Sequence, residues 1–173
     1  MAGADQVTHD EQRARHADRS APVHPVPRVL FLCTGNSCRS QMAEGWARAL
    51  LSGRIEAHSA GTHPQALNRR AVHVMSECGI DISKHQPKRP EDIGLHFDVI
   101  LTVCDSAHES CPAIPGTRTI HAPFDDPPRL AAHATSDDDV MAHYRRVRDE
   151  IRAFVERLPE MLLQSSAMPT KGD

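Results

Sequence analysis

Residues 33–40 combine a nucleophile with groups that bind anions. They read CTGNSCRS, a C-x5-R-S pattern in which Cys33 and Arg39 enclose a glycine-containing loop and Ser40 follows. An arginine guanidinium binds two oxygens of a tetrahedral oxyanion at once, with a geometry that lysine cannot supply. A thiolate next to such an anion can attack it, and the Ser40 hydroxyl can donate to the sulfur. The pattern therefore predicts an oxyanion cradle with a nucleophilic cysteine beneath the anion.

The position of this loop in the chain supports that chemistry. Residues 29–32 form a short apolar run typical of a buried strand, and residues 41–51 carry apolar side chains at helical spacing. A loop that leaves a parallel strand and enters a helix directs its backbone N–H groups into one concavity, where the helix dipole adds positive potential. We expect Gly35 to allow a turn that a side chain would obstruct. The residues expected to bind the oxyanion are Thr34, Gly35, Asn36, Ser37, Cys38, Arg39 and Ser40.

The pKa of Cys33 is expected to lie below its ordinary value, because the same N–H groups and Arg39 favour the thiolate. The alternative is an ordinary strand-to-helix turn with incidental cysteines. It would need the nucleophile, the spacing, the arginine and the position between strand and helix to coincide by chance. We therefore prefer the oxyanion cradle.

Two further cysteines are candidates for the same site. Cys104 directly follows the apolar run of residues 97–103, a predicted strand, which would place it at the same edge of the sheet as Cys33. Cys111 lies beyond a polar segment, residues 105–110, which we expect to be a mobile loop. Two thiols supply two electrons when they form a disulfide. Cysteines kept reduced are expected to be catalytic groups or metal ligands and not a disulfide framework.

The remaining cysteines are expected to have other roles. We expect Cys78 to be a buried structural thiol in the last turn of a helix at residues 66–78, which Gly79 can end in a left-handed conformation. A zinc site is an alternative use of the other four cysteines, which show C-x4-C and C-x6-C spacings. Neither spacing is that of the usual zinc knuckle, and Cys38 would have to turn away from the oxyanion loop. We therefore expect no bound metal.

The composition excludes several classes of protein. The chain has 173 residues, of which 39% are hydrophobic and 25% charged, which suits one soluble globular domain. No apolar run approaches the roughly 18 residues of a membrane span, and residues 1–27 contain no secretory signal. A formal net charge of -3 offers no general attraction to nucleic acid or anionic lipid. We expect a cytoplasmic protein with reduced cysteines and with no nucleic-acid or membrane partner.

The predicted elements alternate between strands and helices. Further strands are expected at residues 54–60 and 117–121, and Ser136 is expected to cap a long amphipathic helix. This order implies parallel strands joined by right-handed crossovers, an α/β fold. We expect three segments, namely a disordered N-terminal tail at residues 1–27, a catalytic domain at residues 28–163 and a flexible C-terminal tail at residues 164–173.

The segment CTGNSCRSQMAEG, residues 33–45, resembles the active-site loop of the low-molecular-weight protein tyrosine phosphatase superfamily. Within that superfamily the arsenate reductases are the closer match. The resemblance covers about residues 28–163 and implies a three-layer α/β fold with a central four-stranded parallel sheet flanked by helices. It also implies that Cys33 attacks the oxyanion and that Arg39 stabilises it.

The superfamily also implies a general acid. In the family this is an aspartate before a proline, on a loop facing the cradle, and FDDP at residues 124–127 matches it. Protonation of a leaving oxygen requires a carboxylic acid within hydrogen-bond reach. An acidic turn without a catalytic role would also explain these residues. Together with the oxyanion loop, the match favours Asp126 over Asp125 as the acid.

The resemblance to the thioredoxin-coupled arsenate reductases implies a relay of three sulfurs. Cys33 attacks arsenate with loss of water, Cys104 attacks Cys33 as arsenite departs, and Cys111 then attacks Cys104 and carries the disulfide to the surface for thioredoxin. Related reductases that use glutathione or mycothiol would not need Cys111. The implied partners are arsenate, with phosphate or sulfate as competing anions, and thioredoxin as the electron donor. No tightly bound cofactor is implied, and we expect a monomer.

Related reductases bind potassium beside the oxyanion loop. Asn36, Glu44 and Ser59 match three of those positions, and we expect them to support the loop. The fourth position, normally an aspartate, holds Lys88. A lysine ammonium there would replace the charge of the cation and predicts little stimulation by potassium. The alternative is an exposed Lys88 with the alignment shifted by one residue.

Two other functions compete with arsenate reduction. Tyrosine phosphatases of the superfamily carry aromatic residues after the Asp-Pro pair to sandwich a phenyl ring, but Pro128 and Arg129 follow here. A thiol-based sensor would hold trivalent arsenic with its cysteines, but it would have no use for Arg39 in an oxyanion cradle, and no DNA-reading helix accompanies it. An arsenate reductase that serves arsenic detoxification is the preferred interpretation.

Overall fold

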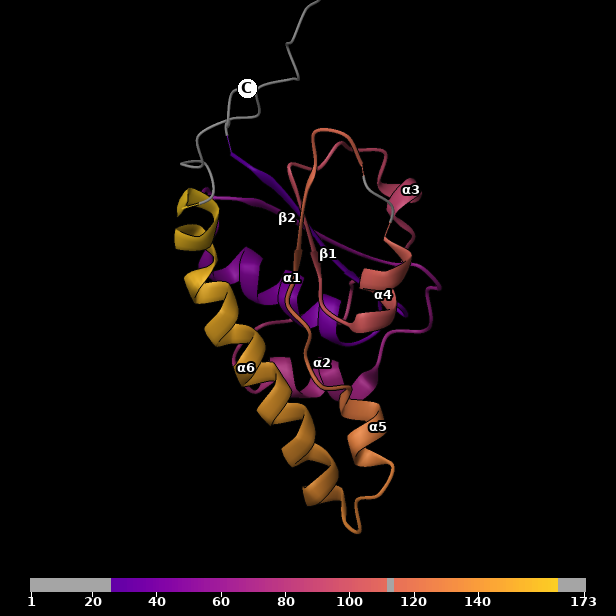
Figure 1. The fold of residues 1–173 in the computed structure, drawn as a ribbon. Coiled ribbons are helices and arrows are strands. Elements are labelled where there is room, and N and C mark those ends of the chain that lie inside the picture. Colours follow the sequence, from indigo (N-terminus) through magenta and orange to yellow (C-terminus); the bar gives the residue numbers. More distant parts are fainter. Residues whose placement is uncertain (1–25, 112–113, 165–173) are drawn as a thin grey trace, which may run out of the picture.

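Four parallel strands form the centre of the structure, a computed structural model that describes residues 26–111 and 114–164 (Figure 1). The strand order is β2-β1-β3-β4. The strands are β1 (Arg28–Cys33), β2 (Glu56–Gly61), β3 (Val99–Thr102) and β4 (Arg118–His121). The four-stranded parallel sheet is thereby confirmed. Apart from residues 26, 27 and 164, the two predicted tails lie outside the described residues.

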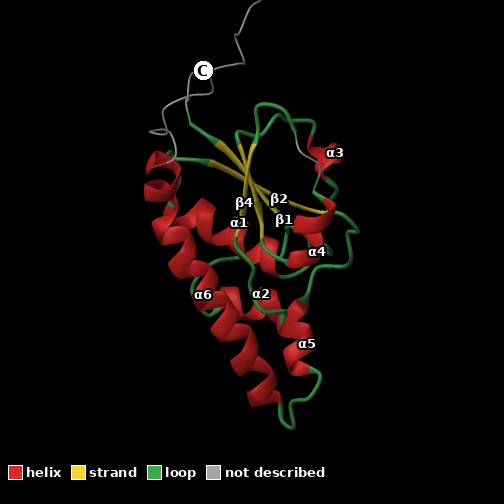
Figure 2. Cartoon of the chain, viewed as in Figure 1, coloured by secondary structure: helices red, strands yellow, loops and turns green. Residues whose placement is uncertain are grey.

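Helices cover both faces of the sheet, which confirms the three-layer α/β fold (Figures 1 and 2). One layer contains α6 and the three helices that α6 contacts. These helices are α1 (Arg39–Leu50), α2 (Arg69–Ser76), α5 (Pro127–Ala131) and α6 (Asp137–Gln164). Two short helices, α3 (Pro90–Ile93) and α4 (Asp105–Ser110), lie on the opposite side.

The central strands bring the functional loops to one edge of the sheet. Residues 29–31 of β1 are at most 1% exposed because helices cover both of their faces. In the parallel register, Leu32 pairs with Thr102 of β3 and Cys33 pairs with Gly61 of β2. The carboxyl ends of these three strands therefore lie side by side, and the segments that follow them can build one site.

The long helix α6 holds α1 in place. The Ser136 hydroxyl accepts a hydrogen bond from the Asp139 N–H group at 3.1 Å, which confirms the predicted cap. The helix continues through Pro159, and the Arg152 guanidinium lies 5.0 Å from the centroid of the Trp46 ring on α1. No helix within the described residues is long and apolar enough to cross a membrane.

The expectation of a mobile loop at residues 105–110 is wrong, because these residues form α4. Ala107 is fully buried, and the Ser110 hydroxyl donates to the Ser106 carbonyl at 2.7 Å. Asp105 lies in the first turn, where an acidic side chain suits the helix dipole. The buried Ala107 side chain and contacts of Asp105 and His108 with the strand residues Thr102 and His121 hold this polar helix on the sheet.

The expectation that Cys78 is buried is also wrong. Cys78 is exposed because α2 ends at Ser76, two residues before it. Gly79 does adopt the expected left-handed conformation, with φ of 76°. The residues that α2 buries against the core are Ala71, Val74 and Met75.

Candidate active site

Residues 33–40 form a loop between β1 and α1, and its unusual backbone conformation lies at Asn36 rather than at Gly35. Asn36 has a φ of 45° and is fully buried. Its side-chain amide donates to the hydroxyls of Ser40 and Ser59, each at 2.9 Å, and its Oδ1 accepts from the Lys88 N–H group at 2.9 Å. Asparagine tolerates the left-handed region better than most residues. The left-handed conformation therefore belongs to Asn36, while a Cβ atom on Gly35 would lie only 3.1 Å from the Ser37 hydroxyl oxygen, as expected of a position that a side chain would obstruct.

A glycine of β2 permits the loop to lie where it does. A Cβ atom on Gly61 would come within 2.7 Å of both the Asn36 nitrogen and the Thr34 carbonyl oxygen. Because Gly61 has no side chain, the chain after β2 runs along the loop. Its N–H groups donate to loop carbonyls, as in the hydrogen bonds from Thr62 to Cys33 at 3.1 Å and from Gln65 to Gly35 at 2.8 Å. Hydrogen bonds from the segment after β2 thus fix the shape of the loop.

The Cys33 sulfur lies at the bottom of this loop. It accepts a hydrogen bond from the Asn36 N–H group at 3.1 Å and lies 2.9 Å from the Ser40 hydroxyl. The Ser40 oxygen also accepts from the Asn36 amide, and its own proton can be donated to a Cys33 thiolate. Burial raises the pKa of the Cys33 thiol, while the hydrogen bonds from Ser40 and Asn36 act in the opposite direction.

The expectation of a lowered pKa for Cys33 is therefore wrong in this conformation. The cause is burial of the sulfur. Arg39 points away from it, and its Nη2 atom forms an ion pair with Asp126 Oδ1 at 2.9 Å. Its Nη1 atom donates to the carbonyl oxygen of Phe124 at 3.0 Å. The guanidinium is thus bound to the loop opposite, and burial dominates at the sulfur.

The two neighbouring aspartates have different environments. Asp126 pairs with Arg39 and caps α5, where it accepts from the Arg129 N–H group at 3.3 Å. Asp125 instead pairs with Arg146 of α6 at 2.8 Å, and this hydrogen bond lowers the pKa of Asp125. The structure therefore places Asp126, and not Asp125, against the arginine of the oxyanion loop.

A cavity of about 220 Å³ opens above the loop. It contains two residues that the sequence patterns did not indicate, Gln65 and Pro128. Both come from segments that meet the loop only in the folded chain. The lining residues are Cys33, Thr34, Gly35, Ser37, Cys38, Arg39, Gln65, Asp126 and Pro128.

Cys104 lies beside the oxyanion loop, as expected from its place after β3. It is buried, and its sulfur lies 3.5 Å from the hydroxyl of Thr34 in the loop. It precedes α4 directly as the N-cap residue. Because β1 and β3 are adjacent and parallel, Cys33 and Cys104 are neighbours at one edge of the sheet.

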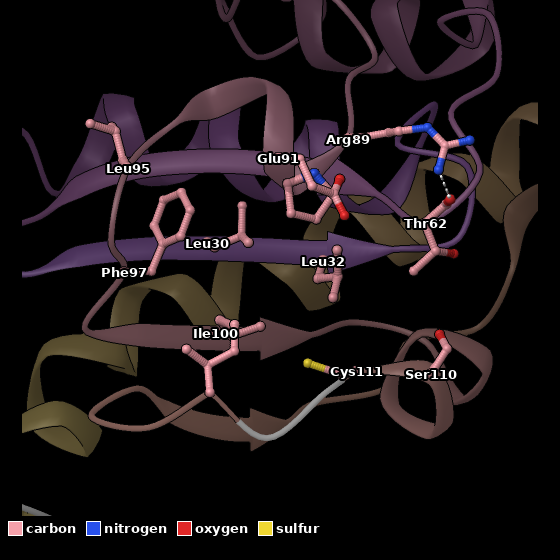
Figure 3. Close-up of a pocket in the computed structure, with 12 residues that line it drawn as sticks. Leu30, Leu32, Thr62, Arg89, Glu91, Leu95, Phe97, Ile100, Ser110 and Cys111 are labelled. Carbon is pink, nitrogen blue, oxygen red and sulfur yellow. Dashed lines mark hydrogen bonds between the residues drawn. The ribbon is translucent and has the colours of Figure 1, made fainter.

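Cys111 is the C-cap residue of α4, whereas Cys104 is its N-cap residue, so the helix separates the two cysteines. The Cys111 sulfur points into an apolar pocket of about 360 Å³, which includes Leu32 and Ile100 (Figure 3). Burial raises the pKa of the Cys111 thiol, and a hydrogen bond with Thr119 acts in the opposite direction. All five cysteines are thiols in this structure.

Comparison with known proteins shows the family. The sequence profile of the family "Low molecular weight phosphotyrosine protein phosphatase" matches residues 28–167. The chain belongs to this family. An arsenate reductase of Halalkalibacterium halodurans is 40% identical over 134 residues, 76% of this chain and 94% of the relative. An arsenate reductase of Bacillus subtilis is 43% identical over 125 residues, 71% of this chain and 88% of the relative.

Solved structures of the phosphatase family have the same fold. A structure of an arsenate reductase in the phosphate binding state superimposes on this chain with a TM-score of 0.60 at 30% identity. The match covers 79% of this chain and 98% of the other.

Behind the loop of this phosphatase-family chain lies a buried polar cluster. The Ser59 hydroxyl donates to Glu44 Oε2, and Glu44 is only 2% exposed. Two cations face this carboxylate. Arg48 Nη2 lies 2.5 Å from Oε1, and Lys88 Nζ lies 4.0 Å from Oε2. The four loop-support residues Asn36, Glu44, Ser59 and Lys88 are therefore brought together.

The remaining cysteine of the loop, Cys38, is buried at the start of α1, and burial raises its pKa. Within residues 26–111 and 114–164, no three His, Cys, Asp or Glu side chains are arranged to hold a metal ion.

Proposed function

We propose that this member of the phosphatase family reduces arsenate to arsenite. The observation that carries the proposal is the position of Cys104 beside the oxyanion loop, next to the nucleophile Cys33 and in contact with Thr34. A phosphatase needs one cysteine at this place, whereas reduction of arsenate needs two electrons and hence a second thiol. The arsenate reductase relatives support the same reaction.

In the first step, the Cys33 sulfur forms a bond to arsenic and an arsenic–oxygen bond breaks. The oxygen leaves as water, with protons from the thiol and from Asp126. Arg39 leaves its ion pair with Asp126 and binds two oxygens of the anion. The Ser40 hydroxyl, which lies 2.9 Å from the sulfur, donates to the thiolate and stabilises it before it attacks.

In the second step, the Cys104 thiolate attacks the Cys33 sulfur. The sulfur–arsenic bond breaks and its electron pair remains on arsenic, which is thereby reduced from arsenic(V) to arsenic(III). The arsenite anion leaves and takes up a proton from water to become arsenous acid. A disulfide between Cys33 and Cys104 remains. The Thr34 hydroxyl can donate to the Cys104 sulfur and favour its thiolate.

In the third step, Cys111 attacks Cys104 and releases Cys33 as a thiol. The helix α4 lies between the two cysteines and has six residues, Asp105–Ser110. At a rise of about 1.5 Å per residue, its two flanking cysteines are about 10 Å apart. A disulfide requires Cα atoms within about 7 Å. The third step therefore requires α4 to unwind.

Thioredoxin is the proposed electron donor. The unwinding of α4 would carry the Cys104–Cys111 disulfide to the surface, where a thiol of a second protein can attack it. Phosphate and sulfate are expected to compete with arsenate, because the loop recognises a tetrahedral oxyanion. We also propose that Lys88 takes the place of potassium, because its ammonium lies near the buried carboxylate of Glu44.

The test is arsenate-dependent oxidation of NADPH in the presence of thioredoxin and thioredoxin reductase, with hydrolysis of an aryl phosphate measured in parallel. We expect many turnovers of arsenite per protein and slow phosphate-ester hydrolysis. Rapid ester hydrolysis without arsenite production would favour a phosphatase. Stoichiometric binding of arsenite without turnover would favour a sensor.

A further inference from the structure

We propose that Gln65 is a substrate-contacting residue that sets the affinity of the loop for its oxyanion. This inference rests on the proposed function for the identity of the anion, but the contact it describes applies to any tetrahedral oxyanion. Nothing in the C-x5-R-S pattern indicates Gln65. This residue follows β2 and lies in a different part of the chain from the loop.

The backbone of Gln65 is fixed to the loop. Its N–H group donates to the carbonyl oxygen of Gly35 at 2.8 Å. Its carboxamide lies over the same residue, because a Cβ atom built on Gly35 would be 3.5 Å from Gln65 Oε1. The side chain lines the cavity of about 220 Å³ together with Cys33, Arg39 and Asp126. It therefore forms part of the wall around the bound anion.

A second glutamine shows what a purely structural carboxamide does at this loop. Gln41 is fully buried, its Nε2 donates to the Asn36 carbonyl at 2.9 Å, and its Oε1 lies 2.9 Å from His85 Nδ1. Both ends of its amide are used inside the protein. The Gln65 carboxamide is exposed and makes no side-chain hydrogen bond to any described residue. Its two polar ends are available to a molecule in the cavity.

The chemistry of the anion explains why an amide suits this place. The backbone N–H groups of the loop and Arg39 are donors only. Arsenate and phosphate carry at least one hydroxyl at neutral pH, and arsenous acid carries three. Each hydroxyl needs an acceptor. A carboxamide offers both functions, so Gln65 Nε2 donates to an anion oxygen while Oε1 accepts from a hydroxyl. The other side-chain acceptors in the cavity are the hydroxyls of Thr34 and Ser37 and the Asp126 carboxylate, which pairs with Arg39 in this structure.

The experiment compares Gln65→Met, which keeps the length of the side chain without its hydrogen bonds, with Gln65→Glu, which adds a negative charge. Gln86→Met is the matched control, because Gln86 is also exposed and lies outside the cavity. The probe is inorganic phosphate. Its binding is measured by protection of Cys33 from alkylation, followed by mass spectrometry of the Cys33 peptide, and requires no turnover.

We expect the phosphate concentration for half-protection to rise roughly tenfold in Gln65→Met, as for the loss of one hydrogen bond to a charged group. It should rise further in Gln65→Glu, because the carboxylate repels the anion, and stay unchanged in Gln86→Met. The KM for arsenate should rise in parallel. An unchanged half-protection concentration in Gln65→Met would overturn the inference.

The outcomes separate this inference from the proposed function. If the wild-type protein binds phosphate in a Gln65-dependent manner but reduces no arsenate, the proposed function fails and the contact stands. If arsenate is reduced with an unchanged KM in Gln65→Met, the contact fails and the function stands. Thermal unfolding of the three variants should match that of the wild type, because both glutamines are exposed. If Gln65→Met had a lower Tm, and the loss of folded protein alone explained the weaker phosphate binding, the inference of a direct contact would also be overturned.

Discussion

Arg39 and Asp126 form an ion pair of 2.9 Å across the mouth of the oxyanion cavity. The guanidinium is the strongest anion-binding group of the loop, yet in this structure its partner is a carboxylate of the protein. An oxyanion that enters the cavity must therefore compete with Asp126 for Arg39. In the proposed mechanism, the same exchange releases the carboxylate to take up a proton and act as the acid, so that anion binding also prepares the acid.

This relationship predicts opposite effects of one substitution on binding and on turnover. Asp126→Asn removes the charge that competes for Arg39, so phosphate should bind more tightly. It also removes the proposed general acid, so turnover should fall by about 100-fold or more. The measurements are phosphate protection of Cys33 from alkylation and the steady-state rate with arsenate.

Asp125→Asn is the matched control for that prediction. Asp125 pairs with Arg146 on α6 and not with Arg39. Its substitution should leave both measurements near the wild-type values. If Asp125→Asn lost activity and Asp126→Asn did not, the roles of the two aspartates would be exchanged.

The relay predicts different failures for its cysteines. Cys33→Ser should release no arsenite, because no bond to arsenic forms. Cys111→Ser should release one equivalent of arsenite and then stop, because the Cys33–Cys104 disulfide has no resolving thiol. Arsenite is measured after a single addition of arsenate and then with thioredoxin present. Cys78→Ser is the control, since Cys78 is exposed and outside the site. Steady-state turnover in Cys111→Ser would contradict the relay.

The helix α4 is predicted to unwind when the last disulfide forms. In the reduced protein its amides are protected by helical hydrogen bonds, and the buried side chain of Ala107 anchors it. In protein oxidised at Cys104 and Cys111, the amides of residues 105–110 should exchange with solvent much faster. Hydrogen exchange of the two forms measures this. The amides of α6 provide the internal control, and equal protection of α4 in both forms would count against unwinding.

The strand, the loop and the start of α1 could be predicted from the sequence because the pattern is local. Cys33, Arg39 and Ser40 lie within one segment, and their order along the chain already sets their order around an anion. Cys104 could be placed because a buried strand directly precedes it. The general rule that parallel strands end at one edge then brings it near Cys33.

The features that the sequence did not reveal depend on contacts between distant segments. Gly61 matters only because Asn36 and Thr34 lie where its side chain would be. Gln65 joins the cavity because the chain after β2 runs along the loop. The raised pKa of Cys33 follows from burial of its sulfur in the folded chain, and the direction of Arg39 is set by a loop more than 80 residues further along the chain. No local pattern contains this information.

The stability of the fold is predicted to depend on pH through Glu77. Arg145, with Arg148, lowers the pKa of Glu77 to about 2. A carboxylate whose pKa is lower in the folded than in the unfolded state stabilises the fold above its unfolded pKa, and this contribution disappears as the pH falls through the folded pKa. Glu77→Gln should therefore lower the Tm at pH 7, by a few degrees at most for a partly exposed pair.

The difference in Tm between wild type and Glu77→Gln should narrow below about pH 4.5 and vanish only below about pH 2. Thermal unfolding followed by circular dichroism across this range measures it. Glu150→Gln, which removes an exposed pair with Arg146, should have a smaller effect. A difference that was constant from pH 7 to pH 2 would show that Glu77 acts through its size and not through its charge.

The charges around the buried carboxylate of Glu44 predict how turnover responds to sodium and potassium. Glu44 is 2% exposed and accepts from Ser59, and the ammonium of Lys88 lies 4.0 Å from it. With this charge in place, exchange of sodium for potassium should not change the turnover of the wild-type protein. Lys88→Met removes the charge but keeps the length of the side chain. Its turnover should be lower in sodium and should rise several-fold in potassium, because Asn36, Ser59 and Glu44 can then hold the ion. Lys84→Met, at an exposed lysine nearby, should behave like the wild type. A several-fold stimulation of the wild-type protein by potassium would mean that Lys88 does not replace the cation.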